Sequence, residues 1–266
     1  MQNDNTEKDI EDLLKKINNF KNENFSNKTN SDIEKMIVNI LGIKSIKENT
    51  IQVKKLPTSE HYFRVRNEYD YIEDYKKNNN FDIKNLLGNP EAPLARMNVK
   101  NEQGLYLSNK FETAMLECDV KEQNTFSVAI FIPKTTLNVI ATSISNKQHN
   151  TSNKKEIIKN FIYDCLTMPV DKEKNIYRIT NTLLKILYKS YNTDGLLYYS
   201  SKRKNDFNLF INKNSVEKLE LKYVFTCKYE NGLIITNINR VEDNELFEDV
   251  TEEEIKDVLS KSDFVI

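Results

Sequence analysis

The stretch GLYLSNKFETAMLEC, residues 104–118, joins a short strand to a helix. GLYLS is typical of a strand, and Asn109 with Glu112 three residues later has the spacing of a capping box, so we expect a helix capped by Asn109. On that helix Ala114 and Glu117 are i, i+3 neighbours, which places Glu117 on the stripe that faces the core. A carboxylate in that position needs a partner or a function, and an ordinary solvated glutamate is the alternative interpretation.

Strands and helices are interspersed on both sides of this stretch. Alternating or apolar runs predict strands at 50–56, 61–67, 126–132, 136–142, 195–201 and 206–212, and a hairpin over 219–241 that turns at Asn231-Gly232. Apolar residues at helical spacing predict helices that begin at Thr6 and Ser31 and others over 154–166, 175–191 and 251–260. Because the order lacks a βαβ rhythm, we expect an α+β fold, with a mixed or antiparallel sheet core and flanking helices.

The pattern also predicts how the chain is divided. Residues 1–45 are expected to form a helical N-terminal segment, and residues 46–266 the main domain. The apolar stripes of the N-terminal helices fit packing on the parent domain, self-association into a homo-oligomer, or docking of a partner equally well. Residues 70–100 form a long irregular stretch, and stretches of this length are uncommon unless they have a function.

Composition excludes several classes of protein. The 39 Lys and Arg residues nearly balance the 40 Asp and Glu residues, so a net charge of −1 predicts neither nucleic acid nor a membrane surface as partner. Three widely spaced cysteines without a CxxC, together with only two histidines, argue against disulfides, a metal site and a Ser-His-Asp triad. The polar start of the chain and the absence of a long apolar run predict a cytoplasmic protein.

The candidate residues for chemistry are polar groups at strand ends. The sequence lacks GxGxxG, GxxxxGK[ST], GxSxG and HExxH motifs. In HYFRVRN (61–67), alternation places Arg64 and Arg66 on the same side of the strand. By residue type alone, Arg64 is a strand arginine paired with a carboxylate, Tyr106 is a core residue, and the cysteines are buried packing residues.

Four motifs, which span residues 58 to 212 in order, resemble those of the RES-domain family. They are HYFRVRN, which places Arg64; LARMN, which places Arg96 and Asn98; GLYLSNKFETAMLE, which places Tyr106, Thr113 and Glu117; and TDGLLYYSSKRKNDFNLFI, which places Asp194, Gly195, Ser200 and Asn208. The chain departs from the family pattern at Ala95, Val99 and Tyr199. Arg66 is an alternative to Arg64, and Ser201 an alternative to Ser200.

The resemblance implies an ADP-ribosyltransferase-like fold that binds NAD as substrate and breaks its nicotinamide–ribose bond, with water or inorganic phosphate as acceptor. NAD-degrading members of this family are toxins that stop growth, and a helical antitoxin protein is the implied partner. No cofactor and no metal are expected.

The implied roles follow from the residue types. Planar guanidinium groups suit the diphosphate, which assigns Arg64 and Arg96. The Glu117 carboxylate would stabilise an oxocarbenium-like ribose. Substrate-binding roles fall to the remaining residues: Tyr106 against nicotinamide, Ser200 on a ribose or amide, and Asn98 and Asn208.

Two other functions stay open from the sequence. One is an ADP-ribosyltransferase that modifies a macromolecule, which needs a surface for its acceptor. The other is a non-catalytic NAD-binding module that keeps the fold without turnover.

Overall fold

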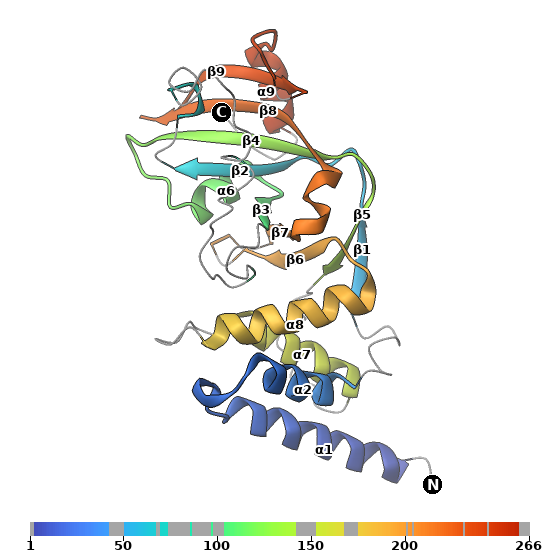
Figure 1. Ribbon diagram of the computed structural model, residues 1–266. Helices are drawn as coiled ribbons and strands as arrows, with labels where there is room; N and C mark the ends of the chain where they lie inside the picture. The colour runs from blue at the N-terminus through green and yellow to red at the C-terminus, as the bar shows by residue number, and fades with distance from the viewer. Residues whose placement is uncertain are drawn as a thin grey trace. The chain divides into compact units, whose positions relative to one another are not determined.

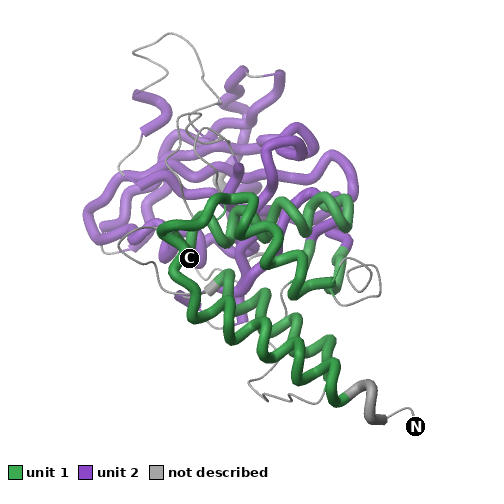
Figure 2. The backbone as a smooth tube through the Cα atoms, turned by 60° about the horizontal axis from the view of Figure 1, so that its bottom comes forward, with its two compact units in different colours: residues 1–54, 92–102, 140–193 green, residues 55–91, 103–139, 194–266 purple. Residues whose placement is uncertain are grey.

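The computed structural model describes most of the chain. The described residues are 3–42, 51–67, 70–73, 86, 97, 104–141, 153–167, 175–200, 202–203, 205–230, 232–243 and 245–260. The chain divides into two compact units, which Figure 2 colours separately. Unit 1 comprises residues 1–54, 92–102 and 140–193, and unit 2 comprises residues 55–91, 103–139 and 194–266.

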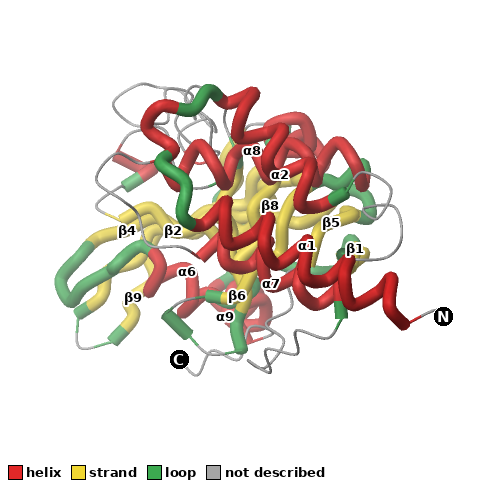
Figure 3. Tube along the Cα trace, turned by 90° about the horizontal axis from the view of Figure 1, so that it is seen from below, coloured by secondary structure: helices red, strands yellow, loops and turns green. Residues whose placement is uncertain are grey.

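Helices and strands are mixed along the chain (Figures 1 and 3). The helices are α1 (Asn3–Lys21), α2 (Asn30–Leu41), α6 (Phe111–Glu117), α7 (Lys154–Thr167), α8 (Asn175–Tyr191) and α9 (Glu252–Ser260), with short 3-10 turns η1 (Phe25–Asn27) and η2 (Lys213–Lys218). The strands are β1 (Gln52–Leu56), β2 (Tyr62–Asn67), β3 (Leu105–Ser108), β4 (Thr125–Pro133), β5 (Leu137–Ala141), β6 (Gly195–Tyr199), β7 (Phe207–Ile211), β8 (Leu219–Tyr229), β9 (Leu233–Glu242) and β10 (Glu245–Phe247).

The strands form one sheet in the order β1-β5-β6-β7-β3-β2-β4-β8-β9-β10. The seven neighbouring pairs from β6 to β10 are antiparallel. Neighbours in the sheet are often distant in sequence, as where β3 lies between β7 and β2. The prediction of a mixed or antiparallel sheet with flanking helices is confirmed.

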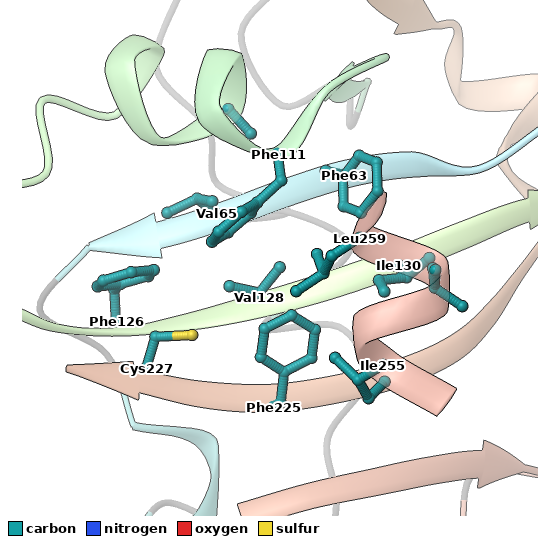
Figure 4. Packing of buried hydrophobic residues seen from close by; sticks show 12 residues of the cluster. Phe63, Val65, Phe111, Phe126, Val128, Ile130, Phe225, Cys227, Ile255 and Leu259 are labelled. Atoms are coloured by element: carbon teal, nitrogen blue, oxygen red, sulfur yellow. The ribbon is translucent and has the colours of Figure 1, made fainter. Parts of the chain in front are cut away.

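The hydrophobic core of unit 2 lies between the sheet and two helices (Figure 4). Apolar side chains from one face of β2, β4 and β8 meet α6 and α9. Alternation along β2 puts Phe63 and Val65 into this core, whereas Arg64 and Arg66 point to the other side. Both arginines therefore lie on the same side of the strand, as predicted, and that side is the one opposite this core.

In its described part, unit 1 contains the helices α1, α2, α7 and α8, which pack on one another. Phe20 at the end of α1 contacts Phe25 at 4.9 Å and Phe161 of α7 at 5.3 Å between ring centroids, and all three rings are buried. The helices in the first 45 residues thus share a core with helices more than 100 residues later. Whether residues 46–266 form a domain without them stays a prediction. Among the described helices, none has the combined length and apolar character needed to cross a membrane.

Some predicted element starts are wrong by a few residues. Helix α2 begins at Asn30 and not at Ser31, with a capping box formed by Thr29 and Asp32. The N-cap of α6 is Lys110, because the Asn109 side chain instead accepts a hydrogen bond from the Phe207 N–H of β7. Both errors have one cause: several polar residues near each start can serve as caps, and tertiary contacts select among them.

Candidate functional site

A pocket of about 510 Å³ in unit 2 lies where β2 and β3 part. The two strands pair at a single register position, Phe63 opposite Ser108. Beyond Phe63, β2 stays paired with β4, and β3 is paired along its length with β7. The pocket is lined from both strands, by Arg64 to Asn67 on one side and by Tyr106 and Leu107 on the other. Its volume falls in the range of roughly 300–1,000 Å³ that is typical of small-molecule sites.

Arg64 is one of two arginines among the described residues that line this pocket. Its Nη1 donates to the Tyr106 backbone oxygen at 3.2 Å, whereas its buried Nε has no hydrogen-bond partner among the described residues. No carboxylate in the described part of the chain pairs with Arg64, so the interpretation of a strand arginine in an ion pair does not hold there. Burial, and then the neighbouring charge of Arg66, lowers the pKa of Arg64 to about 10. A partly desolvated guanidinium without a counter-ion is a site for an anionic ligand.

Glu117 is the carboxylate of this pocket, at the last residue of α6. The prediction that it faces the core is wrong: Phe111 and Ala114 are buried, but Glu117 is exposed. Its Oε1 accepts a hydrogen bond from Asn208 Nδ2 at 2.8 Å and another from Ser200 Oγ at 2.6 Å. Both hydrogen bonds end on Oε1, so Oε2 has no hydrogen-bond partner among the described residues and is the oxygen available to a ligand.

Asn208 connects Glu117 to the sheet. It is 3% exposed, and its Oδ1 accepts a 2.6 Å hydrogen bond from Ser108 Oγ, the residue directly opposite in the β3–β7 register. The amide orientation is therefore fixed at both ends, with its oxygen toward Ser108 and its nitrogen toward Glu117. Ser108 is a contributor to the site that the sequence did not single out.

Ser200 approaches Glu117 from the turn between β6 and β7. It does not line the pocket wall, and its hydroxyl oxygen accepts hydrogen bonds from the backbone N–H groups of Lys202 and Arg203 at 3.1 and 3.2 Å. The turn is held against α6 by Asp206, which accepts a 2.6 Å hydrogen bond from Thr113 and pairs with Arg203 and Lys110. Thr113 and Glu117, one helical turn apart, thus both bind this turn, and Glu112 of the same helix forms an ion pair with Arg203 at 3.4 Å.

An aromatic residue and a thiol complete the described wall of the pocket. The Tyr106 ring is half-buried and contacts Phe210 edge-on at 4.9 Å between centroids. Cys118 Sγ donates to the Val65 backbone oxygen at 3.1 Å, and burial raises the pKa of its thiol. The prediction that the cysteines are buried packing residues holds for Cys165 and Cys227, but Cys118 lines the pocket.

No family model matches this chain. No curated protein matches it either. Among solved structures, a chain of the crystal structure of the M. tuberculosis MbcT–MbcA toxin–antitoxin complex is similar, with a TM-score of 0.38 and 12% sequence identity. The likeness covers 70% of this chain and 91% of that chain. At this level it carries no inference about activity, which has to come from the pocket.

Of the predicted site residues, the structure brings Arg64, Tyr106, Glu117 and Asn208 into one pocket and places Ser200 against Glu117. Arg66 also lines the pocket, so geometry leaves both arginines as candidates. Arg96, Asn98 and Ser201 lie outside the described residues. Asp194 and Gly195 are structural: Asp194 accepts hydrogen bonds from Asn138, Ser215 and Lys218.

No metal site is formed by the described residues, since no group of three or more His, Cys, Asp or Glu side chains among them gathers closely enough to hold an ion. The described wall instead combines cations, one carboxylate and an aromatic ring. These groups suit a ligand that carries both an anionic part and a part that becomes cationic.

Proposed function

We propose that this protein cleaves the nicotinamide–ribose bond of NAD and transfers the ADP-ribosyl group to water or inorganic phosphate. The observation that carries the proposal is the pocket between β2 and β3. Among the described residues, Arg64 in this pocket has no carboxylate partner. Glu117 accepts its hydrogen bonds there through Oε1, which leaves Oε2 available to a substrate. The motif resemblance to the RES-domain family selects the same residues independently.

The anionic half of the substrate fits the arginines. NAD carries a diphosphate, and a guanidinium can meet a phosphate with two parallel hydrogen bonds. Arg64 has donors available for this, because among the described residues its guanidinium donates to the Tyr106 oxygen alone. Arg66 adds a second positive charge to the same wall.

The carboxylate fits the reacting half. When the nicotinamide–ribose bond breaks, nicotinamide leaves with both bonding electrons, which neutralises its ring nitrogen, and the anomeric carbon becomes cationic. Glu117 Oε2 would stabilise that positive charge from a fixed position, since Oε1 is held by Asn208 and Ser200. The oxygen of water or phosphate then donates a lone pair to the anomeric carbon, and water releases its proton to solvent.

The remaining role to assign is the contact with nicotinamide, the leaving group, and it falls to Tyr106. The half-buried ring of Tyr106 offers a face or edge against which nicotinamide can pack. Because nicotinamide is already cationic before the bond breaks, the reaction needs no strong general acid. In a cell, loss of NAD would stop growth, so we propose a toxin, with an antitoxin protein as the partner that holds it inactive.

The test is NAD consumption by the purified protein, with and without phosphate. Wild-type protein should consume NAD, and Glu117→Gln should lower kcat by about 100-fold to 1,000-fold, as removal of one preorganised group in a site does. Glu122→Gln is the matched control, because Glu122 is exposed in the turn after α6 and outside the pocket. Its activity should equal that of the wild type.

Product analysis separates the acceptors. Free ADP-ribose indicates water, and ADP-ribose 1-phosphate that appears only with phosphate indicates phosphorolysis. Label from NAD that stays attached to a macromolecule would instead establish a transferase. NAD that stays intact with well-folded protein in every buffer would overturn the proposal and favour a binding module.

A further inference from the structure

The Ser200 hydroxyl has no hydrogen-bonding capacity left for a substrate. A serine hydroxyl donates one hydrogen bond and accepts two. Its proton goes to Glu117 Oε1 at 2.6 Å, and its lone pairs receive the backbone N–H groups of Lys202 and Arg203 at 3.1 and 3.2 Å. All three positions are therefore used within the protein.

We propose that Ser200 is a positioning residue that, together with Asn208, holds the Glu117 carboxylate so that Oε2 faces the pocket. The inference rests on the proposed function, in which Glu117 is the catalytic carboxylate. It assigns Ser200 a role different from the substrate contact that the residue type suggests, because the hydroxyl reaches the substrate only through Glu117.

The surroundings of Ser200 give it a fixed position from which to do this. The Ser200 N–H donates to the Asp206 backbone oxygen at 2.9 Å, which closes the turn between β6 and β7. Asp206, 5% exposed, binds Thr113 of α6 through its side chain at 2.6 Å. The helix that carries Glu117 is thus tied to the turn that carries Ser200 through Thr113, through Glu117 itself and through the ion pair of Glu112 with Arg203.

Two donors on a single oxygen also fix the rotation of the carboxylate. Ser200 and Asn208 approach Oε1 from different elements, the β6–β7 turn and β7, and Asn208 is itself oriented by Ser108. A carboxylate at the exposed end of a helix would otherwise rotate freely, and catalysis falls steeply when a group moves by about 1 Å. Ser200 and Asn208 together form a clamp that holds the Glu117 carboxylate in one orientation.

The test compares Ser200→Ala with Ser200→Thr and with Ser215→Ala. Ser215 is the matched control, because its hydroxyl also donates to a carboxylate, Asp194 Oδ1 at 2.8 Å, in the same unit but outside the pocket. Ser200→Ala should lower kcat by about 10-fold to 100-fold, the effect of losing one hydrogen bond to a charged group, with KM within about 2-fold. Ser200→Thr should restore most of kcat, and Ser215→Ala should keep it.

A rise in KM at constant kcat in Ser200→Ala would overturn the proposal, because it would make Ser200 a substrate contact. Unchanged kcat and KM would overturn it as well. A second measurement does not need turnover: the ¹³C signal of the Glu117 carboxyl, assigned with Glu117→Gln. It should shift and broaden in Ser200→Ala and return in Ser200→Thr. If wild-type protein leaves NAD intact, the proposed function fails, and this signal alone decides whether the clamp exists.

Discussion

At the residue scale, the burial of the Arg64 guanidinium opposes the stability of the folded chain. Its guanidinium is partly desolvated, and within the described part of the chain its buried Nε has no hydrogen-bond partner and no carboxylate forms an ion pair with it. Arg178 in unit 1 is the contrasting case, because its guanidinium donates to the backbone oxygens of Phe25 and Lys28 and to the Asn30 side chain. Arg178 thus binds the segment between α1 and α2, whereas the described residues give the Arg64 guanidinium one hydrogen bond, to the Tyr106 oxygen.

We expect Arg64→Met to weaken NAD binding and raise stability. Burial lowers the pKa of Arg64 from its ordinary value to about 10, so its charge opposes folding at every pH below about 10, and the penalty is relieved only as the pH rises above that value. At neutral pH the variant should melt about 2–4 °C higher, the shift that about 1 kcal/mol gives in a chain of this size. The Kd for NAD should rise by about 10-fold or more, because charged hydrogen bonds to the diphosphate are lost.

Arg178→Met is the control in the same thermal-melting experiment. It should melt at a lower temperature than wild type, because the Phe25 and Lys28 carbonyl oxygens lose their donor. If Arg64→Met melted lower than wild type to the same extent as Arg178→Met, Arg64 would be a structural residue and its assignment to the ligand would be wrong.

At the element scale, β6 packs against β7 closely enough to require glycine at its start. A Cβ on Gly195 would lie 2.0 Å from the Phe210 backbone oxygen and 3.1 Å from the Ile211 Cα. Both neighbours are backbone atoms of a paired strand, so neither can move without breaking the β6–β7 register. The same register carries Asn208 toward Glu117, which links the packing of β6 to the site.

Gly195→Ala is therefore expected to destabilise the protein by about 1–3 kcal/mol or more, in the range of overpacked cores. Tyr199→Ala is a control on the same strand, since the Tyr199 side chain is 39% exposed and its removal should change stability by only about 0.5 kcal/mol. Chemical denaturation of both variants measures the difference. Equal stabilities would mean that the strands can separate to admit a methyl group.

The positions of the helices and strands could largely be predicted from the sequence, whereas the pairing of the strands could not. Helix α8 spans Asn175–Tyr191 as its apolar spacing predicts, because a 3.6-residue period is a local property. The Thr29 capping box of α2 was missed because Thr29 and Ser31 have the same capping chemistry, and only the contacts of the folded chain distinguish them. The strand order depends on pairings between distant segments, which no local pattern encodes.

The site was predictable to a similar degree. Motif resemblance named Arg64, Tyr106, Glu117 and Asn208, and the structure brings them together. The motif did not predict the hydrogen bonds of Ser200. They depend on neighbours from a turn and a helix that meet only in the folded chain. The pocket lies where β2 and β3 part, and its position could not be predicted because it depends on which strands pair.

At the scale of the whole molecule, the chain crosses between its two units several times, so sequence position and spatial grouping differ. Residues 1–54 and 140–193 belong to one unit, and the pocket residues all belong to the other. Within unit 1, the N-terminal helices contribute buried side chains from Leu13 to Leu41 to a core shared with α7 and α8. This grouping bears directly on whether residues 46–266 can fold as a separate domain.

We expect that a chain cut to residues 46–266 is not stable. The truncation removes Phe20, which packs against Phe161 at 5.3 Å, and with it the fully buried Ile33 and Ile37 of α2. Burial of each such side chain contributes roughly 1.5–3 kcal/mol. Loss of several of them approaches the total stability of a typical domain, about 5–15 kcal/mol, and leaves the apolar faces of α7 and α8 open to water. The truncated chain should aggregate or bind a hydrophobic dye.

A co-expression experiment decides between this expectation and an independent domain. Residues 1–45 supplied as a separate chain should restore solubility to residues 46–266, because the two pieces together hold the complete set of helices of unit 1. As a control, Lys21→Ala in the full chain removes only the exposed ion pair with Asp164, and it should leave the melting temperature within about 2 °C, since such pairs contribute about 0–1 kcal/mol. A truncated chain that is soluble, melts cooperatively and turns over NAD alone would show that residues 46–266 are a domain and that the N-terminal helices are an addition to it.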